Sequence, residues 1–167
     1  MRLSTLLLAL ACCAWVPARA CTPLPGAFME DEAAVRHRFD RADAVVVATL
    51  VNTRVVKTAL GNNSEIATFK VDTVYKGPAK QGDLWVSREH TSCGRTASNK
   101  PTWFEAEHGP MPFSRRWLLY WYMGEELEIS DDGMTFPVNV VPGSLKILPK
   151  LAAEWRKTQH EKRRRQP

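Results

Sequence analysis

Residues 44–56 read AVVVATLVNTRVV, a run rich in β-branched side chains. Such residues favour an extended backbone, because their side chains pack well on a pleated surface. A second run, residues 66–75 (IATFKVDTVY), alternates apolar and polar side chains with the period of a half-buried strand. The polar turn at 61–64 (GNNS) separates the two runs, so they are predicted to form a long hairpin.

Three shorter runs complete the predicted strands. Residues 83–88 are expected to form the third strand, 116–123 the fourth and 127–129 a short fifth. A long excursion, residues 90–115, separates the third strand from the fourth. Five strands in this arrangement predict a mainly β fold and a closed five-stranded barrel.

A helix is predicted on each side of the strands. Residues 29–41 carry acidic side chains early and basic side chains late, which complements a helix dipole. A C-terminal helix is predicted to begin near Pro149 and to dock an apolar stripe on the barrel. The stripe consists of Leu148, Leu151, Ala152 and Trp155. Beyond Arg156 no residue is apolar, and disorder is predicted there.

The first twenty residues have the anatomy of a cleaved secretory signal. Arg2 precedes an apolar run, and residues 18–20 (ARA) form a small-x-small pattern directly before Cys21. The apolar run is too short to span a bilayer. The predicted organisation is a signal peptide at 1–20, a barrel domain at 21–147, and a C-terminal helix with a disordered basic tail at 148–167. The mature protein is expected to be a secreted or periplasmic monomer.

Two cysteines remain after cleavage, Cys21 and Cys93. Two cysteines in an exported chain indicate one disulfide, with two unpaired buried thiols as the alternative. A further alternative is lipidation of Cys21, as in bacterial lipoproteins, although Arg19 and the missing Leu depart from the usual signal. Lipid would tether the protein to a membrane and leave Cys93 unpaired.

Positive charge is concentrated at the C-terminus. The formal net charge is +5, yet residues 21–155 carry 15 basic and 17 acidic side chains. Weak contact with anionic surfaces is predicted for the basic tail. Its residues are Lys162, Arg163, Arg164 and Arg165. The body lacks a basic groove with stacking aromatic residues, which argues against nucleic-acid binding.

The sequence contains no motif typical of an enzyme or a metal site. The four histidines show no HExxH or other metal-ligand spacing, and Gly-x-Ser-x-Gly does not occur. Glu105, Glu107 and His108 are the candidates for a hydrolytic alternative, but polar residues in a loop are more often simply solvated. The sequence therefore favours a binding protein with no cofactor or metal of its own.

Several short motifs follow one another in a fixed order. They are the mature N-terminal Cys21, FDRADAVVVA at 39–48, ATFKVDTVYKG at 67–77, SCG at 92–94 and WLLY at 117–120. Together they resemble the netrin-like domain family, which includes the tissue inhibitors of metalloproteinases, over about residues 21–130. The resemblance implies an OB-fold-like barrel, and the short chain with a lone disulfide favours a divergent bacterial member.

The resemblance also implies chemistry at the mature N-terminus. It implies that Cys21 is disulfide-bonded to Cys93. It further implies that the α-amino group and carbonyl of Cys21 chelate the catalytic zinc of a protease, with Thr22 in the specificity pocket. The inhibitors have Cys-x-Cys here, whereas this chain has Pro23 at the third position. The terminal segment would therefore be held less rigidly, and rigidity favours tight binding.

The favoured function is an exported binding module that acts through protein contacts of its N-terminal segment and its 90–115 loop. Inhibition of a zinc metalloprotease is the alternative. The candidate contact residues are Cys21, Thr22, Trp103, Phe104, Met111 and Phe113. The four loop side chains have an alternative role, which is to cover an open end of the barrel.

Overall fold

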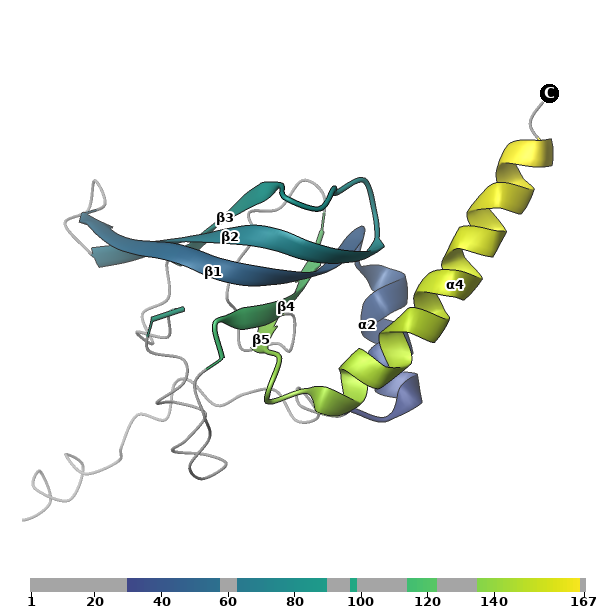
Figure 1. The fold of residues 1–167 in the computed structure, drawn as a ribbon, viewed down its shortest axis with the longest axis horizontal. Helices are drawn as coiled ribbons and strands as arrows, with labels where there is room; N and C mark the ends of the chain where they lie inside the picture. The colour runs from purple at the N-terminus through teal and green to yellow at the C-terminus, as the bar shows by residue number, and fades with distance from the viewer. Residues whose placement is uncertain (1–29, 58–62, 90–96, 99–113, 123–134, 166–167) are drawn as a thin grey trace, which may run out of the picture.

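The structure is a computed structural model that describes residues 30–57, 63–89, 97–98, 114–122 and 135–165 (Figure 1). In chain order the elements are α2 (Glu32–Arg41), β1 (Ala44–Lys57), β2 (Asn63–Lys76), β3 (Leu84–Glu89), β4 (Arg116–Trp121), β5 (Thr135–Pro137) and α4 (Pro142–Arg165). The predicted fold class is confirmed: the protein is mainly β, with five strands, a short N-terminal helix and a C-terminal helix.

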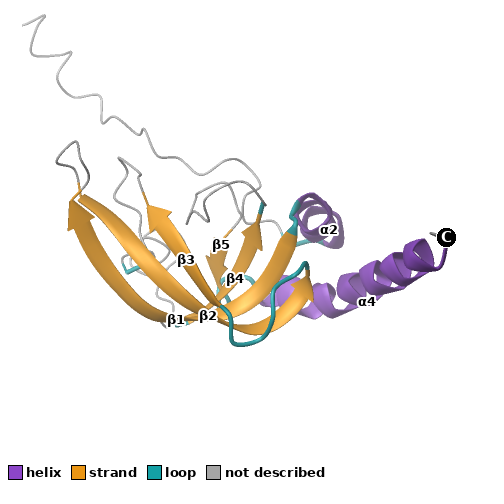
Figure 2. Ribbon diagram, turned by 90° about the horizontal axis from the view of Figure 1, so that it is seen from above, coloured by secondary structure: helices purple, strands orange, loops and turns teal. Residues whose placement is uncertain are grey.

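The five strands form one antiparallel sheet in the order β3-β2-β1-β4-β5. The predicted hairpin is therefore confirmed, and β1 is the central strand. Figure 2 shows the sheet strongly curved, with both helices at one end. Among the described residues the sheet is open between β3 and β5, where a closed barrel was predicted.

The hairpin of β1 and β2 carries the register irregularities that accompany this curvature. The pairing shifts three times: β2 has the extra residue opposite Val45 and Val46 and opposite Val47 and Ala48, and β1 has it between Leu50 and Asn52. An extra residue in one strand of an antiparallel pair bends that strand and increases its twist. The two longest strands of the sheet, β1 and β2, are thus both bent along their length.

Two apolar clusters lie on opposite faces of the sheet, and β1 contributes to both. Val45 and Val47 belong to the cluster that the two helices cover, whereas Val46 and Ala48 belong to the cluster on the other face. Successive side chains of a strand point to opposite faces. The uninterrupted run AVVVA is therefore explained by burial on both sides.

Helix α2 is held at both ends. The side chain of Asp31 accepts a hydrogen bond from the Ala34 backbone nitrogen at 2.8 Å, which caps the start of the helix. At the other end Lys76 Nζ donates to the carbonyls of Phe39 and Asp40, at 2.8 and 3.0 Å. A cation at the C-terminus of a helix complements the dipole, so Lys76 connects the last turn of α2 to β2.

Helix α4 begins earlier and ends later than predicted. It starts at Pro142 rather than near Pro149, and the Glu30 carboxylate accepts a hydrogen bond from the Ser144 backbone nitrogen at 2.7 Å. An acidic side chain at a helix N-terminus satisfies a free N–H group and complements the dipole. The predicted stripe is confirmed, with Leu148, Leu151 and Ala152 buried and Trp155 packed beside them.

The tail predicted to be disordered is helical through Arg165. We call residues 156–165 of α4 the basic arm. Its residues are exposed except for the half-buried Gln159, so packing does not explain its order. Most of its residues are good helix formers, and the packed half of α4 supplies the nucleus from which the helix continues. Cations in the last turn also complement the dipole.

The fifth described strand is not the one predicted. Residues 127–129 lie outside the described residues, whereas β5 consists of Thr135–Pro137. Its three residues are buried, and Pro137 pairs with Trp117 at the edge of the sheet. Proline lacks the N–H group that a central strand needs, so it suits an edge strand. So short a strand with a proline gives almost no sequence signal.

Candidate functional site

The residues predicted to contact a partner lie outside the described part of the chain. They are Cys21, Thr22, Cys93, Trp103, Phe104, Met111 and Phe113. The structure does describe the residues that bound the 90–115 loop and two residues within it, Ala97 and Ser98. These positions define how the loop is attached to the sheet.

The described residues on either side of 90–96, the segment that includes Cys93, both contact Glu65 of β2. On one side, β3 ends at Glu89, which pairs directly with Glu65. On the other side, the Glu65 carboxylate accepts a hydrogen bond from the Ser98 backbone nitrogen at 3.2 Å and another from the Ser98 hydroxyl. Ala97 is fully buried in the apolar cluster that β1 and β2 share. The residues on both sides of 90–96 are thus held by one buried residue, Glu65, through its backbone on one side and its carboxylate on the other.

The end of the 90–115 loop is fixed on β1. The Leu50 backbone nitrogen donates to the Arg115 carbonyl at 2.7 Å. The Arg115 guanidinium in turn donates to the carbonyls of Leu50 and Val51, at 3.1 and 3.4 Å. Residues 99–113 are therefore attached at Ser98 on one side and near Arg115 on the other.

The described polar residues at this end of the sheet make structural contacts. The carboxylate of Glu65 holds Ser98, and the Arg115 side chain binds backbone carbonyls. Within the described ranges, no group of three or more His, Cys, Asp or Glu side chains could hold a metal ion. No helix of these ranges is both long and apolar enough to cross a membrane.

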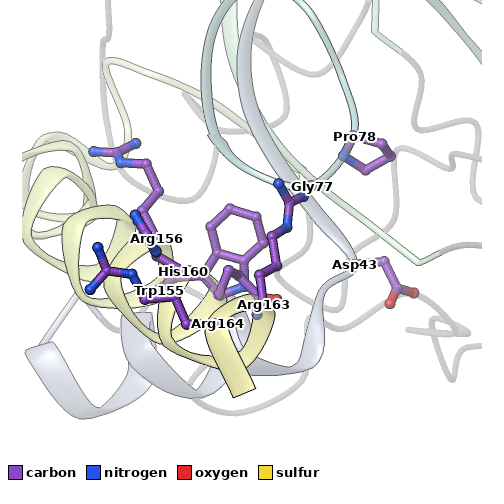
Figure 3. A pocket seen from close by; sticks show the side chains of 9 residues that line it. Asp43, Gly77, Pro78, Trp155, Arg156, His160, Arg163 and Arg164 are labelled. Atoms are coloured by element: carbon purple, nitrogen blue, oxygen red, sulfur yellow. The ribbon is translucent and has the colours of Figure 1, made fainter. Parts of the chain in front are cut away.

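A second candidate site lies at the opposite end of the sheet, between α4 and the turn after β2. It is an open groove of about 740 Å³. We call it the arm groove. Figure 3 shows side chains of α4 on one side of it and Asp43 and Pro78 on the other. Trp155 lies where the packed half of α4 meets the basic arm.

Only part of the predicted anionic-contact cluster lies in the arm groove. Arg163 and Arg164 line it, whereas Lys162 and Arg165 do not. Arg156 and His160 also line the groove, although they were not among the residues predicted from the sequence to contact an anionic surface. Their spacing from Arg163 and Arg164 is the i, i+4, i+7, i+8 pattern of one helix flank. This helical spacing was not used as a signal because the tail was predicted to be disordered, and a disordered segment has no helix flank.

Gly77 brings the far wall of the groove close to the start of β1. Its φ is +94°, and a Cβ at this position would lie 2.6 Å from the Asp43 carbonyl oxygen. Only glycine permits both the backbone conformation and this approach. The wall is therefore a tight junction between the end of β2 and the residue that precedes β1.

The sequence matches no model of a known protein family, and no curated protein matches it significantly.

Proposed function

We propose that this protein is an exported binding module that contacts a partner protein through its N-terminal segment and its 90–115 loop. The observation that carries the proposal is the attachment of that loop at Glu65 and near Arg115. A binding loop supported on rigid strands loses less conformational entropy on association than a free loop does. The two attachments support a loop that presents its side chains from a fixed base.

The export step and the disulfide belong to the same proposal. A chain cleaved before Cys21 with one bridge to Cys93 would connect the new N-terminus to the segment that returns to Glu65. Intact mass before and after reduction and alkylation tests this directly. Two thiols that appear only after reduction would support the bridge, whereas a lipid-sized mass increase with one free thiol would exclude it.

Cross-linking tests the contact surface. A photo-reactive side chain placed at Trp103 or Phe113 is expected to give discrete adducts with one protein in the native compartment. The same group at His37, on α2, serves as the matched control. Adducts of the same pattern from all three positions, or adducts from His37 alone, would contradict the proposal.

Inhibition of a zinc metalloprotease is the specific form of this function to test first. The proposal rests on the resemblance of the N-terminal motifs and on the chelating chemistry of a free α-amine with its own carbonyl. An added Ala before Cys21 should abolish inhibition because it moves the amine off the zinc, while Thr22→Ala should only weaken it. Equal inhibition by the extended and the mature protein would rule out chelation.

A further inference from the structure

The arm groove carries unbalanced positive charge. Arg156, Arg163 and Arg164 are exposed, and none of them forms an ion pair within the described residues. The three arginines and His160 occupy one flank of α4 by their spacing, and Figure 3 shows the Arg163 guanidinium turned toward Gly77. The acidic residue of the lining is Asp43, on the opposite side. Three adjacent cations repel one another, and a bound anion would relieve that repulsion.

The shape of the groove favours a chain over a small molecule or a flat surface. It is open along the helix, with the turn at Gly77 and Pro78 as its second wall. A lipid bilayer cannot enter between two walls, and the basic arm has no exposed apolar residue to insert into one. An extended segment laid along α4 could contact the arginines and the partly buried Trp155 together.

The chemistry of the lining favours carboxylates within a peptide. The planar guanidinium of arginine matches the geometry of a carboxylate with two parallel hydrogen bonds. Asp43 would repel a chain that carries a phosphate or sulfate on every unit, whereas a peptide can place an uncharged residue there. We propose that the arm groove is a docking site for an acidic peptide segment of a partner protein. This site is separate from the 90–115 loop and does not depend on the function proposed for it.

The test uses the full mature chain and two variants that remove equal charge from adjacent positions. Arg163→Gln with Arg164→Gln removes two groove cations, and Lys162→Gln with Arg165→Gln removes two cations outside the groove. Fluorescence anisotropy would follow binding of a labelled peptide of Glu and Asp with one central Leu. A peptide with Gln and Asn in place of the acids is the ligand control. Circular dichroism would verify that both variants keep the helix.

Loss of the two groove arginines is expected to weaken binding of the acidic peptide about tenfold, and loss of the control pair less than about twofold. The amide peptide should not bind. Equal weakening by both variants would overturn the proposal, because it would show attraction to net charge alone. Tighter binding of a sulfated oligosaccharide or of anionic vesicles, with the same dependence on Arg163 and Arg164, would also overturn it. So would an acidic peptide that fails to bind at low salt.

Discussion

Gly77 is required for two separate reasons, its backbone conformation and its close packing against the start of β1. Its left-handed backbone is strained for any other residue, and its Cα faces the backbone of Asp43 and Ala44. Gly82 has a similar φ of +93°, but a Cβ there would meet nothing within 4 Å. We expect Gly77→Ala to lower the free energy of unfolding by about 3 kcal/mol, and Gly82→Ala by about 1 kcal/mol. Urea denaturation measures both, and equal losses would show that the close contact at Gly77 has no cost.

Tyr120 makes the stability of the folded protein fall at alkaline pH. Its side chain is buried beneath the helices, and that burial raises the pKa of Tyr120 to about 12, with the Arg38 guanidinium opposing part of the rise. The unfolded chain releases this proton near pH 10, so the folded state holds the proton more tightly between the two values. Stability contributed by Tyr120 is therefore complete below pH 10 and is lost as the pH rises toward 12.

The loss should approach about 1.4 kcal/mol per pH unit within that window. Tyr120→Phe is the matched control because it removes the titration and keeps the ring. Urea denaturation of both proteins between pH 9 and pH 11 would show the stability of the native protein falling relative to that of the variant. Parallel curves would contradict the assignment of the effect to Tyr120.

At the scale of elements, the sequence predicted the strands and helices that have a clear local pattern. It missed the segments whose structure depends on contacts with other parts of the fold. The hairpin of β1 and β2 and the short helix α2 were predictable because alternation, β-branching and the order of acidic and basic residues are local signals. The basic arm was not, because its order depends on the packed half of α4. The groove that the arm lines could not be predicted without it. Strand β5 was missed because three residues have no measurable period.

The basic arm should unfold separately from the rest of α4. Ala153 and Lys157 are both exposed helix positions, one in the packed half and one in the arm. Ala153→Gly is expected to lower the free energy of global unfolding by about 1 kcal/mol, and Lys157→Gly by less than about 0.3 kcal/mol. Chemical denaturation gives the first comparison, and hydrogen exchange should be faster in 156–165 than before Trp155. Equal losses would mean that the arm unfolds together with the body.

The molecule as a whole is a slightly acidic body with a basic projection. Helices α2 and α4 are joined through ion pairs of Arg36 with Glu154 at 2.9 Å and of Lys150 with Glu32 at 2.8 Å, all of which lie before the arm. Removal of residues 156–167 should therefore leave the melting temperature within a few degrees of the original. If the chain is cleaved before Cys21, as proposed, the truncation should also change the sign of the net charge, since residues 21–155 carry 15 basic and 17 acidic side chains.

Ion-exchange chromatography at neutral pH would check the change of sign, and scanning calorimetry the melting temperature. The truncated protein should bind an anion exchanger and the complete one a cation exchanger. A large fall in melting temperature would show that the arm stabilises the body, contrary to its exposure.

The central position of β1 sets the order in which the protein can be completed during synthesis. Val46 pairs with Val74 on one side and with Leu119 on the other, so one edge of β1 finds its partner soon after translation and the other only much later. The apolar side chains of α2, among the first described residues to be made, wait still longer for Leu148 and Leu151. A nascent chain would therefore leave the ribosome with a hairpin that has an open edge and an uncovered face. Helix α4 is translated after every described strand, so the described sheet keeps an uncovered face, open to chaperones, until the residues of α4 have been made.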